Sequence, residues 1–320
     1  MNAPASTMPP PVASLGWPAG PHGPALAPGA RVHLVGIGGA GMSGLARALH
    51  QRGLVVSGSD RDEGPELAGL RALGIDARAG HASSLPPGCA LVVPSPAIPE
   101  DNPELRAARA AGVPVAKRAA LLGALSSESG TRTIAVAGTH GKSTTSGLVA
   151  WILDAAGRDP SYFIGAHVRG LGSNAHATSS RELVVEADEY DRTFLELSPT
   201  IAVITHLELD HPDHYPDDDA FVGAFAAFAA NVAAAGRLIA WAGAPRLAEV
   251  AAACPAPLER YAVAGDPGAE RAEWLATAPE AGPSGQAFDV SGPDGALGRF
   301  TTPLHGRHAV ANALAAVAVA

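Results

Sequence analysis

The stretch TIAVAGTHGKSTT, residues 133–145, decides the fold of the second half of this chain. It opens with an apolar, partly β-branched run at residues 133–137, which predicts a buried strand. A glycine-rich turn follows, and residues 143–156 then show a helical pattern. In such a unit the backbone N–H groups cradle phosphates, a lysine reaches the terminal phosphates and a hydroxyl residue binds Mg²⁺. We therefore expect an ATP site made by Gly138, Thr139, His140, Gly141, Lys142, Ser143 and Thr144. The turn is a shortened variant of the G-x-x-x-x-G-K-[ST] pattern, because Val136 occupies its first glycine position.

A second glycine-rich turn lies nearer the amino terminus, directly after an apolar strand at residues 31–35. Its G-x-G-x-x-G pattern lets the backbone approach a diphosphate at the start of the next helix. Asp60 ends the following strand and could hold a ribose hydroxyl, although a strand-end cap or a solvated carboxylate explains it nearly as well. A tight turn without a ligand is the alternative for the loop. The expected diphosphate contacts are Gly36, Gly38, Gly39, Ala40 and Gly41.

Strands alternate with helices in both halves of the chain, which indicates parallel sheets with right-handed crossovers. The predicted fold class is α/β: a Rossmann-like parallel-sheet domain at residues 31–127, then a P-loop ATPase-type α/β domain at residues 131–320. Residues 1–30 contain no Asp, Glu, Lys or Arg and are rich in Pro and Gly, so a disordered tail is expected there. Residues 265–304 show only short strand-like pieces.

Composition excludes several kinds of partner. The formal net charge is −9 and no basic block is present, which argues against a nucleic-acid partner. No apolar run reaches the ~18 residues that a spanning helix needs, so no membrane insertion is expected. The two cysteines, Cys89 and Cys254, stand in no metal-binding spacing and fit a reducing cytoplasm.

Two acidic segments follow predicted strands of the second half. Glu186 lies inside an apolar run and could coordinate Mg²⁺ beside the phosphate loop, whereas Glu189 and Asp191 fit a solvated acidic turn. Residues 205–215 place histidines among carboxylates, where they could ligate a metal or shuttle a proton. A polar surface loop explains this second segment at least as well.

Taken together, these motifs resemble the Mur ligase family, the ATP-dependent amide-forming enzymes of peptidoglycan synthesis. The matching pieces run in family order from about residue 31 to residue 320. They are residues 36–43, 57–60, 97–104, 138–145 and 186–191, Asp210 with His211, and residues 306–308 with Asn312.

The resemblance implies a reaction and roles for individual residues. The best-matching members join L-alanine to UDP-N-acetylmuramate through an acyl phosphate, with ATP as co-substrate and Mg²⁺ as cofactor. The first loop and Asp60 would then hold the UDP part, with Ser95 nearby. Lys142, Glu186 and His211 would be catalytic. Ser143 and Glu186 would bind one Mg²⁺ and His211 a second, and His308 and Asn312 would approach the adenine.

The chain also departs from the family pattern. Ala309 and His206 each stand where the family usually has Asn, and His305 replaces a usual Pro. The family's third, C-terminal ligase domain would begin where the chain stops, so we expect that domain to be absent from these residues. Three alternatives remain: a related ligase that attaches a whole tripeptide to UDP-N-acetylmuramate, an NAD-dependent oxidoreductase using the first loop, and a non-catalytic nucleotide-binding module.

Overall fold

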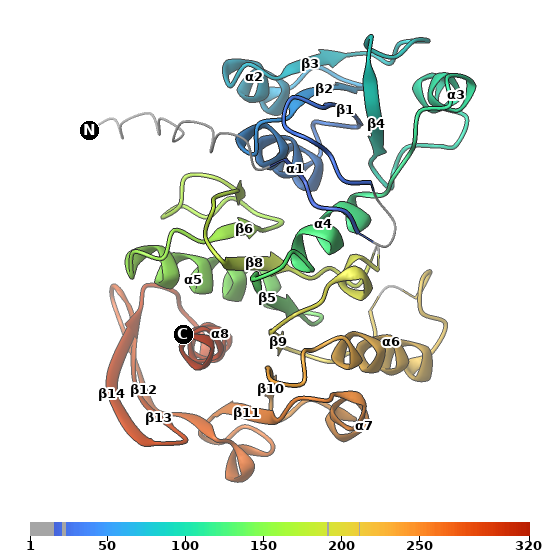
Figure 1. The fold of residues 1–320 in the computed structure, drawn as a ribbon. Helices are drawn as coiled ribbons and strands as arrows, with labels where there is room; N and C mark the ends of the chain where they lie inside the picture. Colours follow the sequence, from blue (N-terminus) through green and yellow to red (C-terminus); the bar gives the residue numbers. More distant parts are fainter. Residues whose placement is uncertain (1–15, 21–23, 191, 211) are drawn as a thin grey trace. The chain divides into compact units, whose positions relative to one another are not determined.

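The computed structural model describes residues 16–20, 24–190, 192–210 and 212–320. The chain forms two compact units, which are treated separately. The first unit contains residues up to Thr131 together with Asp159–Arg181, and the second contains Arg132–Arg158 and Glu182–Ala320 (Figure 1).

The first unit is built on a four-stranded parallel sheet. Its strand order is β3-β2-β1-β4, so the order in which successive strands are added to the sheet reverses between β1 and β4, and ligands bind at such a point in open α/β sheets. The unit's elements are β1 (Arg31–Val35), α1 (Ala40–Gln51), β2 (Val55–Asp60), α2 (Pro65–Ala72), β3 (Asp76–Ala79), β4 (Cys89–Pro94), α3 (Pro103–Ala110), α4 (Arg118–Ser126), β6 (Ser161–Phe163) and β7 (Ala175–His176).

The segment Asp159–Arg181 groups with the first unit, whereas the sequence prediction placed it in the second domain. Its pairing strands β6 and β7 contact α1. Asn174 Nδ2 donates to Ala40 O at 2.8 Å, and Ala177 N donates to the Gln51 side chain at 2.8 Å. These contacts provide hydrogen-bond partners for polar groups at both ends of α1. The local sequence of the segment contains no pattern that predicts them.

The prediction of a disordered tail through residue 30 is wrong for the part that the structure describes. Trp17 and Leu26 are buried and pair as an isolated antiparallel bridge. Trp17 Nε1 donates to Leu121 O at 2.9 Å, and Arg52 Nε donates to Gly16 O at 2.7 Å. A Pro- and Gly-rich composition therefore did not prevent packing, because one large aromatic side chain buries enough apolar surface to anchor the segment.

The second unit is built on a mixed sheet whose strands follow the order β14-β13-β12-β11-β10-β9-β5-β8. Strands β8 to β12 run parallel with β5, and β12, β13 and β14 are antiparallel. The unit's elements are β5 (Arg132–Ala137), α5 (Lys142–Ala155), β8 (Glu182–Glu186), the 3₁₀ helix η1 (Thr193–Glu196), β9 (Ile201–Ile204), α6 (Asp218–Ala230), β10 (Arg237–Trp241), α7 (Leu247–Ala253), β11 (Leu258–Val263), the 3₁₀ helix η2 (Ala269–Arg271), β12 (Trp274–Gly282), β13 (Gly285–Gly292), β14 (Gly295–Thr302) and α8 (Arg307–Val319).

Residues 265–304, in which the sequence suggested only short pieces, contain the three long strands β12, β13 and β14. They form an antiparallel ribbon that curves around α8 (Figure 1). Two-residue turns connect them, Pro-Ser at 283–284 and Pro-Asp at 293–294, and each turn is flanked by glycines. These turn residues explain why the composition looked irregular. Helix α8 is Ala-rich and mostly buried beyond its two exposed first residues, and it also packs against α5.

The predicted α/β class is confirmed, with a parallel sheet in the first unit and a mixed sheet in the second. Within the described residues, no helix combines the length and the hydropathy needed to cross a membrane.

Candidate functional site

The phosphate loop joins the end of β5 to the start of α5 and requires glycine at two positions. Gly138 and Gly141 both have positive φ angles, 125° and 84°. A Cβ atom on Gly141 would lie 2.4 Å from Asn312 Oδ1, and one on Gly138 would lie 2.4 Å from Thr205 Oγ1. Backbone conformation and lack of space therefore both demand glycine here. The first N–H groups of α5 have no intrahelical acceptors, and together with the helix dipole they favour an anion.

Lys142 is the first residue of α5 and is held by two acceptors. Its Nζ donates to Gly138 O and to Glu189 Oε1, each at 2.8 Å. The interpretation of Glu189 as part of a solvated acidic turn is wrong, because its side chain is 0% exposed. Burial raises the pKa of the Glu189 carboxyl, and the hydrogen bond and charge of Lys142 oppose that shift. Its second oxygen, Oε2, has no hydrogen-bond partner among the described residues.

The proposed metal ligands on α5 and β8 come together. Ser143 Oγ donates to Glu186 Oε1 at 2.8 Å, across two neighbouring parallel strands and the helix that follows the first. A hydroxyl and a carboxylate are oxygen donors of the kind that Mg²⁺ prefers, so the pair fits such an ion. His211 and Asp191 lie outside the described residues. In the part of the chain that is described, His, Cys, Asp and Glu form no metal-binding group of three or more.

The segment after β9 lies along one side of the loop. Thr139 N donates to His206 O at 3.0 Å, and Thr139 Oγ1 donates to Glu208 O at 2.8 Å. His140 is exposed, with its Nε2 atom 3.8 Å from a carboxylate oxygen of Glu208. Thr144 lies half-buried in the first turn of α5. The segment therefore shapes the loop through contacts of its backbone at His206 and Glu208.

The His206 ring stacks on the Trp241 ring, with the two centroids 4.2 Å apart. Trp241 Nε1 in turn donates to Asp266 Oδ2 at 3.1 Å, and Arg307 Nε donates to the other oxygen of Asp266 at 2.7 Å. A local sequence pattern could not have found this chain of contacts, since its members come from the segments after β9 and β11, from β10 and from α8.

Helix α8 brings one of its two expected nucleotide contacts to the loop. Asn312 is 8% exposed and lies against Gly141. His308 is exposed at the start of the helix, and its imidazole ring lies against Gly306. Ala309 is 1% exposed, so the small side chain at this position packs inside the unit.

The glycine-rich loop of the first unit follows β1 and opens α1. Gly36 N and Ile37 N both donate to Ser59 O, at 2.8 and 3.0 Å, and Gly38 N donates to Asp60 Oδ2 at 2.8 Å. Asp60 thus binds the backbone of the loop itself. This role is close to the strand-end cap that the sequence offered as the alternative to a ribose contact. A Cβ atom on Gly36 would lie 2.9 Å from Ser95 Cβ, so Ser95 borders the loop as expected.

Arg118 is a residue that the sequence interpretation missed. A Cβ atom on Gly41 would lie 2.9 Å from Arg118 Nη1, so this guanidinium borders the first turn of α1. Arg118 is half-buried and begins α4. The only signal in the sequence is a basic pair, Lys117 and Arg118, just before an apolar helix, and the placement depends on the fold.

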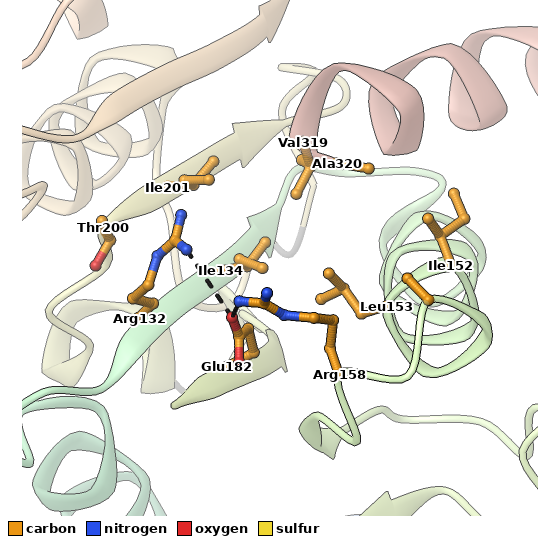
Figure 2. A pocket seen from close by; sticks show the side chains of 11 residues that line it. Arg132, Ile134, Ile152, Leu153, Arg158, Glu182, Thr200, Ile201, Val319 and Ala320 are labelled. Carbon is orange, nitrogen blue, oxygen red and sulfur yellow. Dashed lines mark hydrogen bonds and ion pairs between the residues drawn. The ribbon is translucent and has the colours of Figure 1, made fainter. Parts of the chain in front are cut away.

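The second unit also contains a cavity of about 280 Å³ that belongs to neither loop. Figure 2 shows Arg132 and Arg158 pointing toward Glu182 between them, with apolar side chains of β5, β9, α5 and α8 around them. Arg132 and Glu182 begin β5 and β8, while the phosphate loop follows the other end of β5. The cavity is therefore at the opposite edge of the sheet from Lys142.

The fold and the loop define a class of protein: an α/β chain with a phosphate loop and an acidic strand end beside it. Comparison with known proteins identifies the family. The model described as Mur ligase family, catalytic domain matches residues 31–129, and the Mur ligase middle domain matches residues 136–320. The chain belongs to the Mur ligase family.

Individual relatives agree with this assignment. The chain is 40% identical over 290 residues to a UDP-N-acetylmuramate–L-alanine ligase from Rubrobacter xylanophilus, a match covering 91% of this chain and 62% of the relative. The corresponding protein of Mycobacterium ulcerans is 42% identical over 300 residues, covering 91% and 61%. This chain therefore spans about three fifths of the length of these curated relatives.

Solved structures give the same picture. A UDP-N-acetylmuramate-alanine ligase from Thermotoga maritima superposes with a TM-score of 0.78 at 27% identity, covering 90% of this chain and 64% of that one. A UDP-N-acetylmuramate:L-alanyl-γ-D-glutamyl-meso-diaminopimelate ligase from Neisseria meningitides also gives 0.78, at 30% identity, covering 90% and 92%.

Proposed function

We propose that this chain carries the UDP-sugar site and the ATP site of a cytoplasmic ligase that joins L-alanine to UDP-N-acetylmuramate for peptidoglycan synthesis. One observation carries the ATP part: Lys142 and Ser143 begin α5 beside the phosphate loop and are bonded to Glu189 and Glu186. The names and identities of the Rubrobacter and Mycobacterium relatives support the substrate.

The proposed reaction transfers the terminal phosphoryl group of ATP to the muramate carboxylate. The resulting acyl phosphate is attacked by the amine of L-alanine, and the tetrahedral intermediate collapses to amide and phosphate. Loop N–H groups and the Lys142 ammonium bind the ATP phosphates and stabilise charge in the transition state. Glu189 keeps Lys142 directed at the loop. Asn312 and His308 approach the adenine in this proposal.

Ser143 and Glu186 would hold one Mg²⁺, with His211 the ligand of a second, and the metal supplies positive charge beside the transferring phosphoryl group. Two features of the described residues support this assignment. The Ser143–Glu186 pair provides two hard oxygen donors, and the unpartnered buried oxygen of Glu189 lies near the same helix end.

The UDP part of the substrate would bind at the first loop, formed by Gly36, Gly38, Gly39, Ala40 and Gly41. The start of α1 and the Arg118 guanidinium both border this loop, and each favours an anion such as a diphosphate. Ser95 borders the loop, and Asp60 fixes its backbone.

Isothermal titration tests the two sites on this chain. We expect binding of UDP-N-acetylmuramate and of a non-hydrolysable ATP analogue in the presence of Mg²⁺, and no binding of NAD. Tight NAD binding with no UDP-sugar binding would overturn the proposal in favour of an oxidoreductase.

Phosphate release by the full-length protein with ATP, UDP-N-acetylmuramate and either L-alanine or a tripeptide tests the amino acid. The Neisseria structure makes the tripeptide ligase the second candidate. Turnover with the tripeptide alone would select that alternative. No turnover with either acceptor would select a non-catalytic nucleotide-binding module.

A further inference from the structure

A buried polar cluster lies between the first unit's sheet and α3, where a sheet covered by helices normally presents apolar side chains. Its members are His33 on β1, Ser59 on β2, His81 after β3 and Glu104 in the first turn of α3. Glu104 is 2% exposed, Ser59 3% and His33 6%. The same face of the sheet becomes apolar two residues further along β1, where Val35 packs with Leu105 of α3.

Glu104 is the centre of this cluster. Ser59 Oγ donates to Glu104 Oε2 at 2.5 Å, and Ala82 N donates to Oε1 at 3.2 Å. His33 Nε2 lies 3.4 Å from Oε1 and His81 Nδ1 lies 3.3 Å from Oε2. Burial by itself raises the pKa of Glu104, but the nearby His33 ring and the hydrogen bonds from Ser59 and Ala82 outweigh it and leave the pKa below its usual value. Glu104 is therefore a buried carboxylate that remains ionised at neutral pH.

The cluster reaches the glycine-rich loop through Ser59. The Ser59 carbonyl accepts the N–H groups of Gly36 and Ile37, and the adjacent Asp60 carboxylate accepts that of Gly38. Three consecutive loop amides are thus fixed by two neighbouring residues at the end of β2. Glu104 anchors the first of these through the Ser59 hydroxyl, and His81 Nδ1 contacts the same hydroxyl at 2.8 Å.

We propose that Glu104 is a positioning residue that holds Ser59, and through Ser59 the Gly36–Gly38 backbone, in the conformation that receives a diphosphate. The inference rests on the proposed function, which assigns the UDP-sugar to this loop. A loop fixed before binding loses less conformational entropy when the ligand arrives, so the carboxylate contributes to affinity without touching the ligand.

The test is titration of UDP-N-acetylmuramate and of the ATP analogue into the wild-type chain and into Glu104→Gln, Ser59→Ala and the double variant. Glu104→Gln removes the charge and turns one acceptor into a donor. We expect its Kd for the UDP-sugar to rise about tenfold, the scale of one charge-assisted hydrogen bond, with the Kd for the ATP analogue unchanged. Because Glu104 acts through Ser59, the double variant should bind as weakly as the single variants and no weaker.

A matched control separates positioning from a general loss of stability. Glu128→Gln removes the carboxylate partner of the buried Arg52 elsewhere in the same unit, at 3.0 Å, and should leave the UDP-sugar Kd unchanged. The ¹⁵N amide resonances of Gly36, Ile37 and Gly38 should shift in unliganded Glu104→Gln and stay in place in Glu128→Gln. If Glu104→Gln binds the UDP-sugar like wild type, or if additive losses appear in the double variant, the inference fails. If wild type itself does not bind the UDP-sugar, the proposed function fails instead.

Discussion

The buried pair of Lys142 and Glu189 makes a prediction that separates the nucleotide role of the lysine from its structural role. Lys142→Met removes the ammonium and keeps an unbranched side chain. Glu189, 0% exposed, then loses its only cationic partner within the described residues. Breaking a buried ion pair from one side costs roughly 3–5 kcal/mol, and we expect about 3 kcal/mol because Lys142 is itself 14% exposed. The double variant Lys142→Met/Glu189→Gln should recover most of this loss, because no buried charge remains.

The pH dependence follows from the sign of the shift. The pKa of Glu189 is raised above 4.5 in the folded protein, so the folded state binds the proton more strongly than the unfolded state does. Stability therefore falls as pH rises from 4.5 through the raised pKa, and it is constant above that. In Lys142→Met the two influences that lower this pKa disappear, so the fall should be larger and extend to higher pH. In the double variant it should vanish.

Hydrogen exchange of the β5 and β8 amides, measured at pH 5 and pH 8, reports the opening free energy of the second unit alone. Lys117→Met, which changes the chain's other lysine at an exposed position, is the control. Equal protection in the single and double variants at both pH values would refute the idea that Lys142 neutralises Glu189. Binding of the ATP analogue should be lost in both variants, since both lack the phosphate-binding ammonium.

Three further outcomes are expected. Gly141→Ala should destabilise the second unit by about 1–3 kcal/mol and abolish binding of the ATP analogue, because the new Cβ meets the Asn312 side chain at a positive φ; calorimetry and titration check this. Glu186→Gln should raise the Mg²⁺ concentration needed for half-maximal ATP-analogue binding by roughly tenfold, and an unchanged requirement would remove Glu186 from the metal site. Trp17→Ala should cost roughly 3–5 kcal/mol of first-unit stability by urea denaturation, since the indole is 3% exposed and bonded to Leu121; a neutral result would restore the disordered-tail interpretation.

Local features of the fold were predictable because short-range forces determine them. The strand, glycine turn and helix of residues 133–156 form from apolar patterning and from the conformational freedom of glycine, and these act within a few residues. The same holds for the first loop after β1. The strands of residues 265–304 were less predictable, because β pairing is set by partners elsewhere in the sheet.

The candidate site divides in the same way. The sequence correctly placed Ser143 beside Glu186 at one sheet edge, because carboxyl ends of parallel strands meet there. It did not reveal that Glu189 is buried against Lys142, since an acidic run looks the same whether solvated or enclosed. Burial is a property of the folded molecule, so only the tertiary packing determines which of the carboxylates near Glu189 is desolvated.

The sequence by itself determined the family, the α/β class and the two glycine loops, all of which reside in contiguous motifs. Tertiary structure alone decided that Asp60 holds its own loop, that Arg118 borders α1 and that Asp159–Arg181 belongs to the first unit. Each of these depends on contacts between residues more than twenty positions apart. Forming such a contact costs the conformational entropy of closing the loop between the two residues. No local sequence pattern indicates which of these long-range contacts form.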